Sequence, residues 1–416
     1  MSEKKNVPKL RFPEFTEPWE QRKLGEISDK VTKKNQDVVV DEVFTNSAEY
    51  GIISQRDFFD KDIANTENID GYYVVEPNDF VYNPRISTTA PFGPIKRNKL
   101  ERSGAMSPLY YVFRPHNVDL SYLEWFFQTS CWYPFMRFNG NSGARSDRFA
   151  ITDKIFNEMP ISLPQDIEEQ KRIGIFLTTL DTLIALHQRK LDHVKDLKKS
   201  MLQKMFPKNG QLYPEVRFPE FTDAWEQRKL GEICERITRK NKGNESDLPL
   251  TIASQYGLID QRDFFNKVVA AKDMTNYYLL KKGEFAYNKS YSNGFDYGSI
   301  KRLNEYEKGC LSTLYVCFGI TSDEVDSDYL ECFFDTLNWY HDVATICAEG
   351  ARNHGLLNVD VKAFFTDVKI SLPLQKEEQK RIAECFQQVD TLITLHQREL
   401  DHLRLLKKGM LQQMFV

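Results

Sequence analysis

Apolar and polar residues follow two different patterns along this chain. Between residues 19 and 163, short apolar and aromatic runs are separated by Gly, Pro, Asn and Asp, which is typical of strands joined by turns. The run Tyr122–Phe127 is more typical of a helix. This portion therefore predicts a mixed α+β domain. The clearest expected strands are Tyr72–Val75, Phe80–Tyr82 and Leu109–Phe113.

After Pro164 the pattern becomes helical and continues to about Phe206. Glu168 and Glu169 near the start and Lys198-Lys199 near the end suit the dipole of one long helix. About 40 residues at roughly 1.5 Å each give a rod of roughly 60 Å. Such a rod must bury its apolar seam against a partner. The apolar positions recur mostly in steps of three and four: Ile173, Phe176, Leu180, Leu183, Leu191, Val194, Leu197, Met201 and Met205.

The whole pattern occurs twice. Arg11–Ile27 returns as Arg217–Ile233 with 15 of 17 positions identical, and Leu180–Phe206 returns as Val389–Phe415 with 19 of 27 identical. The offset drifts only from 206 residues for the first of these segments to 209 for the second. Because the repeat is collinear over about 200 residues, it indicates two domains of one kind rather than a solenoid.

The duplication predicts the architecture. We expect an α+β chain in which two similar mixed α/β domains are separated by two long helices that form an antiparallel coiled coil with pseudo-two-fold symmetry. Helix one ends near Phe206 and the second domain begins near Tyr213, so a short linker places that domain at the far end of the helix. Two domains on flexible tethers would leave both seams exposed to water. The expected boundaries are 1–165 for the first domain, 166–212 for helix one and its linker, 213–374 for the second domain, and 375–416 for helix two.

Composition narrows the class of protein. The 416 residues carry a formal net charge of −4, so any surface for phosphates must be local rather than general. The seven cysteines lack CxxC spacing, which argues against a disulfide framework or a zinc site. No run of about 18 apolar residues occurs, so we expect a cytoplasmic protein with no membrane contact.

The repeated motifs resemble a known family. A Leu-Pro pair, a Glu-Gln pair and an isoleucine precede a Leu/Val-Asp-Thr-Leu-Ile segment and a long helix in each copy. Over essentially the whole chain this succession is similar to the specificity subunit of type I restriction-modification systems. The residues that carry the resemblance are Leu163-Pro164, Glu169-Gln170, Ile173 and Leu180–Ile184, with Leu372-Pro373, Glu378-Gln379, Ile382 and Val389–Ile393 in the second copy.

The resemblance implies a function. Each recognition domain would read one half of a bipartite, asymmetric site in double-stranded DNA, and the helices would fix the gap between the halves. Two methyltransferase subunits, which carry S-adenosylmethionine and modify adenines, and restriction subunits would assemble on a chain that is itself non-catalytic and holds no cofactor. The repeated Gln55–Phe59 and Gln261–Phe265 leave open how different the half-sites are.

Two other functions are alternatives: a DNA methyltransferase and a structural adaptor. A DNA methyltransferase with its own recognition domains needs a glycine turn for its cofactor and an NPPY-like loop for the flipped base. Here Asn83-Pro84-Arg85 lacks the second proline and the aromatic residue, and the second copy has Asn288-Lys289-Ser290. A structural coiled-coil adaptor with two protein-binding heads would show no salt-dependent affinity for DNA.

Residues that read bases should differ between the copies while occupying matched positions. Two pairs of stretches behave in this way: residues 82–87 with 287–292, and residues 143–148 with 350–355. Arginine pairs favourably with guanine and asparagine with adenine. The candidate base readers are Arg85, Arg145, Arg148, Lys289, Arg352 and Asn353.

Basic residues that both copies keep are candidates for phosphates, which carry no sequence information, although exposed charge pairs would look the same. They are Lys33, Lys34, Lys96, Arg97, Arg239, Lys240, Lys301 and Arg302. His187 and His396 occupy matched helix positions beside the seam, where we expect them to set the register of the coiled coil, with no metal. Trp19 and Trp225 open the two copies as expected buried anchors, in a segment that serves either partner docking or internal packing.

Overall fold

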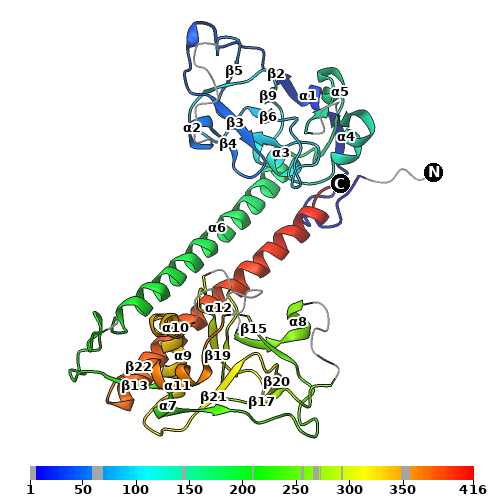
Figure 1. Ribbon diagram of the computed structural model, residues 1–416. Coiled ribbons are helices and arrows are strands. Elements are labelled where there is room, and N and C mark those ends of the chain that lie inside the picture. Colours follow the sequence, from blue (N-terminus) through cyan, green and yellow to red (C-terminus); the bar gives the residue numbers. More distant parts are fainter. Residues whose placement is uncertain are drawn as a thin grey trace. The chain divides into compact units, whose positions relative to one another are not determined.

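The chain divides into two compact units. The structure is a computed structural model that describes residues 6–58, 69–142, 147–208, 210–253, 257–265, 271, 273–291, 294–347 and 357–416. Unit 1 comprises Met1–Gln188 and Arg398–Val416, and unit 2 comprises Arg189–Gln397. The long helices α6 (Ile167–Lys204) and α12 (Lys376–Gln413) each contribute one segment to unit 1 and one to unit 2 (Figure 1).

An antiparallel sheet forms the centre of the globular part of unit 1, with strand order β2-β9-β6-β7. The inner strand β6 is buried at all three of its residues, which explains its apolar sequence. Shorter pairs β1-β12, β3-β4, β5-β8 and β10-β11 surround this sheet. The strands are β1 (Glu20–Lys23), β2 (Ser28–Lys30), β3 (Phe44–Ser47), β4 (Gly51–Ser54), β5 (Tyr73–Val75), β6 (Phe80–Tyr82), β7 (Ile95–Arg97), β8 (Gly104–Met106), β9 (Tyr111–Pro115), β10 (Asn141–Ser142), β11 (Phe149–Ala150) and β12 (Pro160–Leu163).

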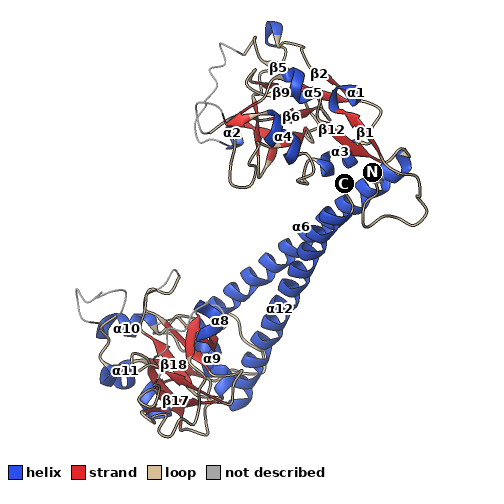
Figure 2. Cartoon of the chain, turned by 90° about the vertical axis from the view of Figure 1, so that its right-hand side faces the viewer, coloured by secondary structure: helices blue, strands red, loops and turns tan. Residues whose placement is uncertain are grey.

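Short helices pack against this sheet and complete the core of unit 1 (Figure 2). Helix α3 begins where the Asp119 carboxylate accepts a hydrogen bond from the Tyr122 backbone N–H at 2.8 Å, a regular N-cap. Its buried face then supplies Tyr122, Trp125 and Phe126 to the core. The helices are α1 (Leu24–Ile27), the 3₁₀ turn η1 (Gln36–Val38), α2 (Gln55–Phe58), α3 (Leu120–Phe126), α4 (Tyr133–Asn139) and α5 (Asp153–Asn157).

Unit 2 repeats this construction. Its central sheet has the equivalent strand order β14-β21-β18-β19, with outer pairs β13-β22, β15-β16 and β17-β20. Its elements are β13 (Glu226–Lys229), α7 (Leu230–Ile233), β14 (Cys234–Ile237), β15 (Leu250–Ala253), β16 (Gly257–Asp260), α8 (Gln261–Phe265), β17 (Tyr278–Lys281), β18 (Phe285–Asn288), β19 (Ser299–Arg302), β20 (Lys308–Leu311), β21 (Val316–Ile320), α9 (Ser327–Asp335), α10 (Tyr340–Ile346), α11 (Val361–Asp367) and β22 (Lys369–Leu372). The predicted α+β class and the two long helices are confirmed.

Within unit 1 the segments of α6 and α12 run antiparallel. Arg404 donates to the Gln188 side chain at 3.0 Å, and Lys407 pairs with Asp181. Towards the end of α12, Phe415 enters the core of the domain, where its ring lies 5.4 Å from that of Tyr122. The partner residue number on α6 falls as the number on α12 rises, so the antiparallel direction expected from the linker holds inside this unit.

Unit 2 pairs the other two segments in the same way. Lys198 on α6 lies 2.7 Å from Asp390 on α12, and the Phe206 ring lies 5.9 Å from that of Phe386. The sequence pattern extends helix one to Phe206, but α6 ends at Lys204. Met205 and Phe206 leave the helix because they are buried in the core of unit 2.

Only some of the apolar positions expected to line the seam of the first long helix are buried. Ile173, Leu180 and Leu191 are buried, whereas Leu183 and Leu197 are exposed. An α-helix repeats every 3.6 residues, so positions chosen in steps of three and four drift away from a single buried line. No helix among the described residues has the length and apolar character to cross a membrane.

Candidate nucleic-acid interface

Two of the sequence stretches that differ between copies meet in unit 1. Arg85, which follows strand β6, and Arg148, which precedes β11, form an antiparallel backbone bridge. The bridge is supported by hydrogen bonds from the Phe149 N–H to the Pro84 carbonyl at 2.8 Å and from the Ile86 N–H to the Asp147 carbonyl at 3.0 Å. Both arginine side chains are exposed. The fold therefore brings two candidate base readers, distant in sequence, to one place on the surface.

The backbone before Arg85 is held in position by Asn83. The Asn83 side-chain amide donates to the Asn46 carbonyl at 2.8 Å, and its carbonyl oxygen accepts from the Arg85 N–H at 3.0 Å. Gly93 lies directly against this segment with φ of +83°, and a Cβ there would stand 2.0 Å from the Asn83 carbonyl oxygen. Only glycine fits that approach. Gly298 packs against Asn288 in the same way in unit 2.

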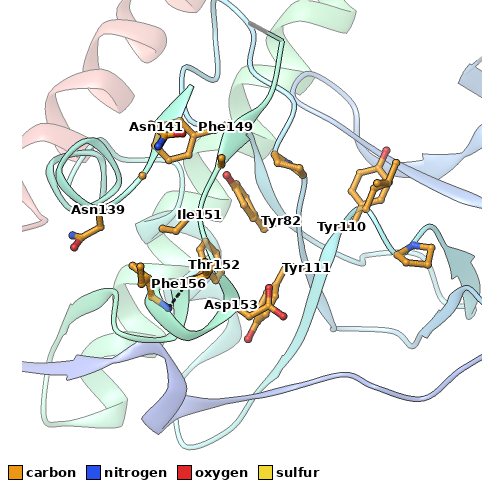
Figure 3. Close-up of a pocket in the computed structure, with 16 residues that line it drawn as sticks. Tyr82, Tyr110, Tyr111, Asn139, Asn141, Phe149, Ile151, Thr152, Asp153 and Phe156 are labelled. Carbon is orange, nitrogen blue, oxygen red and sulfur yellow. Dashed lines mark hydrogen bonds between the residues drawn. The ribbon is translucent and has the colours of Figure 1, made fainter. Parts of the chain in front are cut away.

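A pocket of about 520 Å³ is lined by Pro84 and Phe149, which adjoin Arg85 and Arg148 in the sequence. Phe149 is seen in its wall in Figure 3. Its lining is aromatic and polar. The Tyr111 hydroxyl donates to the Asn157 side chain at 2.6 Å, and burial raises the pKa of Tyr111 to about 12. Asp153, at the pocket edge, pairs with Lys30 at 2.5 Å. The pocket therefore offers hydrogen-bonding groups and ring faces, and Pro84 and Phe149 in its wall are the sequence neighbours of the two arginines.

Unit 2 places Lys289 at the position of Pro84. The Leu357 N–H donates to the Lys289 carbonyl at 2.8 Å, as the Phe149 N–H does to Pro84. The Lys289 side chain is half-buried, and burial, together with the charge of Arg236, lowers its pKa. The other candidate base readers, Arg145, Arg352 and Asn353, lie outside the described residues.

The candidate phosphate contacts near the start of each copy make contacts within their own unit. Lys34 donates to the Gly71 carbonyl at 2.9 Å with its ammonium 3.5 Å from the centre of the Tyr73 ring. Lys240 makes the same pair of contacts, with the Asn276 carbonyl at 2.9 Å and Tyr278 at 4.0 Å. Lys33 pairs with Glu76 at 3.2 Å, and Arg239 pairs with Glu284 at 2.7 Å. A phosphate would have to compete with these partners.

The second set lies where β7 or β19 meets the neighbouring helix. In unit 2, Lys301 lies 2.7 Å from Asp335, and Arg302 lies 2.9 Å from Glu331. In unit 1, Arg97 lies 3.8 Å from Glu124, while Lys96 is half-buried. The role of these residues at phosphates stays a prediction.

The two histidines occupy matched, half-buried positions on their helices, His187 on α6 in unit 1 and His396 on α12 in unit 2. Their part in setting the helix register also stays a prediction. Among the residues that the structure describes, no three side chains of the metal-ligating types gather in one place.

The structure gives the repeated motifs a shared structural role. In unit 1 the buried Glu169 carboxylate accepts two hydrogen bonds from Arg11, at 2.6 and 2.7 Å, and one from the Trp19 indole at 3.2 Å. The adjacent Gln170 accepts from the Asp119 N–H at 2.9 Å and donates to the Pro164 carbonyl at 2.8 Å. We call this set of residues the Glu169 clamp.

Unit 2 contains the same arrangement around Glu378. Arg217 donates to it at 2.7 and 2.8 Å, and Trp225 at 3.2 Å. Trp19 and Trp225 are buried, as expected. Of the two roles weighed for the opening segment, internal packing is therefore observed. The near-identity of this segment in both copies was the signal that could have pointed to the clamp.

Comparisons with known proteins agree with this construction. The family described as type I restriction modification DNA specificity domain matches residues 16–196. The MjaVIII type I restriction enzyme specificity subunit of Methanocaldococcus jannaschii is 25% identical over 276 residues, which cover 62% of this chain and 61% of that protein. The match thus spans about three fifths of that relative's length.

A solved structure shares the fold. The type I restriction-modification S subunit from M. genitalium aligns with a TM-score of 0.56 at 13% identity, covering 99% of each chain. The HsdS subunit of Thermoanaerobacter tengcongensis aligns with a TM-score of 0.46 at 16% identity, covering 95% of this chain and 96% of that one.

The specificity-domain match lies almost entirely in unit 1, and unit 2 repeats the sheet of that unit. Residues 16–196 of this chain match the DNA specificity domain of type I restriction-modification systems, and the chain is similar to a type I specificity subunit over about three fifths of its length.

Proposed function

We propose that this chain is the subunit that reads DNA sequence in a type I restriction-modification complex, and that each unit reads one half of a bipartite, asymmetric site. The observation that carries the proposal is the meeting of Arg85 and Arg148 beside the pocket, within a domain that the specificity family matches. Exposed guanidinium groups can donate two parallel hydrogen bonds to a guanine edge, worth roughly 1–3 kcal/mol of discrimination each.

The duplication supports two readers rather than one. Unit 2 has the same sheet and the same glycine approach at Gly298, and it has Lys289 where unit 1 has Pro84, one position before Arg85. Two readers that share a scaffold but differ at the reading positions are suited to two unequal half-sites. The paired segments of α6 and α12 would then fix the gap between the halves.

The chemistry would belong to partner subunits. Two methyltransferase subunits, with S-adenosylmethionine bound to them, would methylate adenines in the site, and restriction subunits would cleave unmodified DNA. The specificity family itself is non-catalytic. The role of this chain is to bring those subunits to a chosen sequence in double-stranded DNA.

Sequencing of modified bases in a host that expresses the chain with its cognate methyltransferase tests the proposal. We expect one bipartite adenine motif. Arg85→Ala should make one half of the motif degenerate, and Lys289→Ala should affect the other half. Exchange of residues 28–160 for another recognition domain should change only the half that Arg85→Ala affects. A motif without a gap, or two variants that loosen the same half, would contradict the proposal.

A further inference from the structure

One charged cluster differs sharply between the two otherwise similar units. It lies where strand β7 or β19 meets helix α3 or α9 and the long-helix pair. In unit 2 the Asp335 carboxylate lies 2.7 Å from Lys301 and 3.5 Å from Lys198. Burial would raise the pKa of Asp335, but the two lysines outweigh it and hold that pKa below its ordinary value. Each buried lysine thus has a carboxylate partner.

Unit 1 keeps the lysines and lacks this carboxylate. Lys96 and Lys407 stand at the positions of Lys301 and Lys198, while Gln128 replaces Asp335. Burial lowers the pKa of Lys96, and the positive charges of Lys407 and Lys99 lower it further, in spite of opposing carboxylates at Glu124 and Asp181.

The charge balance of the whole cluster is reversed between the units. Among the described residues of unit 1, four cations face two carboxylates: Lys96, Arg97, Lys99 and Lys407 against Glu124 and Asp181. At the equivalent positions of unit 2, three cations face four carboxylates: Lys198, Lys301 and Arg302 against Asp328, Glu331, Asp335 and Asp390. Lys99 is replaced by Asn304, and Ser121 by Asp328.

We propose that Lys96 and Lys407 form a phosphate-binding site in unit 1 that unit 2 lacks, because Asp335 fills the equivalent place there. The geometry of unit 2 demonstrates that an oxyanion at this position reaches both lysines. Gln128 is exposed, so the position is open to a ligand from solution. The ring of Trp125, 4.8 Å from the Lys407 ammonium, holds that cation on its side of the site.

The source of the phosphate rests on the proposed function. On a specificity subunit, the ligand is a phosphate of the DNA backbone, which binds regardless of sequence. The contact therefore adds affinity on the side of the half-site that unit 1 reads. Of the matched lysines Lys96 and Lys301, only Lys96 would then contact a phosphate. Lys301 would instead stabilise the fold through its ion pair with Asp335.

The test compares Lys96→Gln and Gln128→Asp with Lys301→Gln as the matched control, all in the full chain. Gln128→Asp installs the carboxylate of unit 2 and is expected to stabilise the fold, so its result does not depend on a damaged protein. DNA affinity is measured against salt concentration. Both unit 1 variants should lower affinity about tenfold at low salt and reduce the salt slope by about 1, and Lys301→Gln should leave the slope unchanged.

Inorganic phosphate alone provides the second arm. Relative to chloride at equal ionic strength, it should raise the melting temperature of the wild-type chain and of Lys301→Gln, but not that of Gln128→Asp. If phosphate stabilises the chain but the unit 1 variants leave the salt dependence of DNA affinity unchanged, the ligand is not a phosphate of the DNA backbone. Unchanged behaviour of Lys96→Gln and Gln128→Asp in both arms would overturn the site. Failure of the wild type to bind DNA would instead contradict the proposed function.

Discussion

Two buried carboxylates in the described part of the chain lie where several donors meet them. Glu169 and Glu378 are each about 1% exposed, yet each accepts three hydrogen bonds from an arginine and a tryptophan. A carboxylate taken out of water is tolerable only with such partners. The repeated motifs that contain Glu169 and Glu378 therefore have a structural role, because they hold the opening segment of each copy against its long helix.

Asp335 allows a prediction at this scale. Replacement of Asp335 by Asn should lower the free energy of unfolding by about 2 kcal/mol at pH 7, because Lys301 and Lys198 lose a shared carboxylate. Since the folded pKa lies below the ordinary value of 3.8, the stabilisation is complete above that value and is lost as the pH falls through the folded pKa. Denaturant unfolding at several pH values should show a constant difference from pH 6 to 8 that shrinks below about pH 4.

Asp153→Asn is the matched control. Asp153 also pairs with a lysine, Lys30, at 2.5 Å, but both side chains are largely exposed to water. Its replacement should cost less than about 1 kcal/mol. Equal costs for the two variants, or an Asp335 effect that does not shrink at all as the pH falls from 4 to 2, would contradict the interpretation of the unit 2 cluster.

At the scale of elements, the residues at the ends of the long helices contribute to the cores of the domains. Phe415 enters the core of unit 1 against Trp19 and Tyr122, and Phe206 enters the core of unit 2 against Trp225 and Tyr329. Each aromatic residue follows, two residues on, the end of the long helix that starts from the other domain. The helices thus supply core residues as well as connection.

Phe415→Ala should destabilise unit 1 by about 3 kcal/mol and leave unit 2 unaffected, and Phe206→Ala should do the reverse. Hydrogen exchange read by peptide mass spectrometry distinguishes the units, with faster exchange expected only in residues 19–163 for Phe415→Ala. The exposed Phe138, at 88% exposure, supplies a control whose replacement by Ala should change neither. Faster exchange of both units in one single variant would show that the cores are not separate.

Much at the element scale follows from the sequence. The run Phe80–Tyr82 is strand β6, the run around Tyr122 is helix α3, and the helical repeat gives α6 and α12. These follow from local periodicity and turn residues. The meeting of Arg85 with Arg148 does not, because register between distant strands is set by packing. The contrast between Gln128 and Asp335 is likewise visible in the sequence, but its partners Lys407 and Lys198 are known only from the fold.

At the scale of the whole molecule, the exposed leucines of the long helices form an apolar surface that a partner could cover. Leu183 and Leu186 on α6 and their counterparts Leu392 and Leu395 on α12 are each at least 40% exposed. Matched apolar positions on a duplicated chain suit one kind of partner that binds twice. Under the proposed function, that partner would be the methyltransferase subunit.

Leu186→Glu should therefore remove one of two methyltransferase subunits from the complex, and Leu186→Glu with Leu395→Glu should remove both. Native mass spectrometry of the complex purified through this chain gives the count directly. The melting temperature of the free chain should change little, because these side chains are already in water. Full occupancy in the double variant would place the partners elsewhere.

The division of each helix between the two units also bears on how the protein is made. The first domain leaves the ribosome early, but the Phe415 that completes its core is synthesised after the whole second domain. Until then the Trp19 and Tyr122 rings lack their cover, and nascent unit 1 presents an apolar gap to the cell. The domain translated first is the one that finishes folding last, so chaperones have a reason to hold it for the full duration of synthesis.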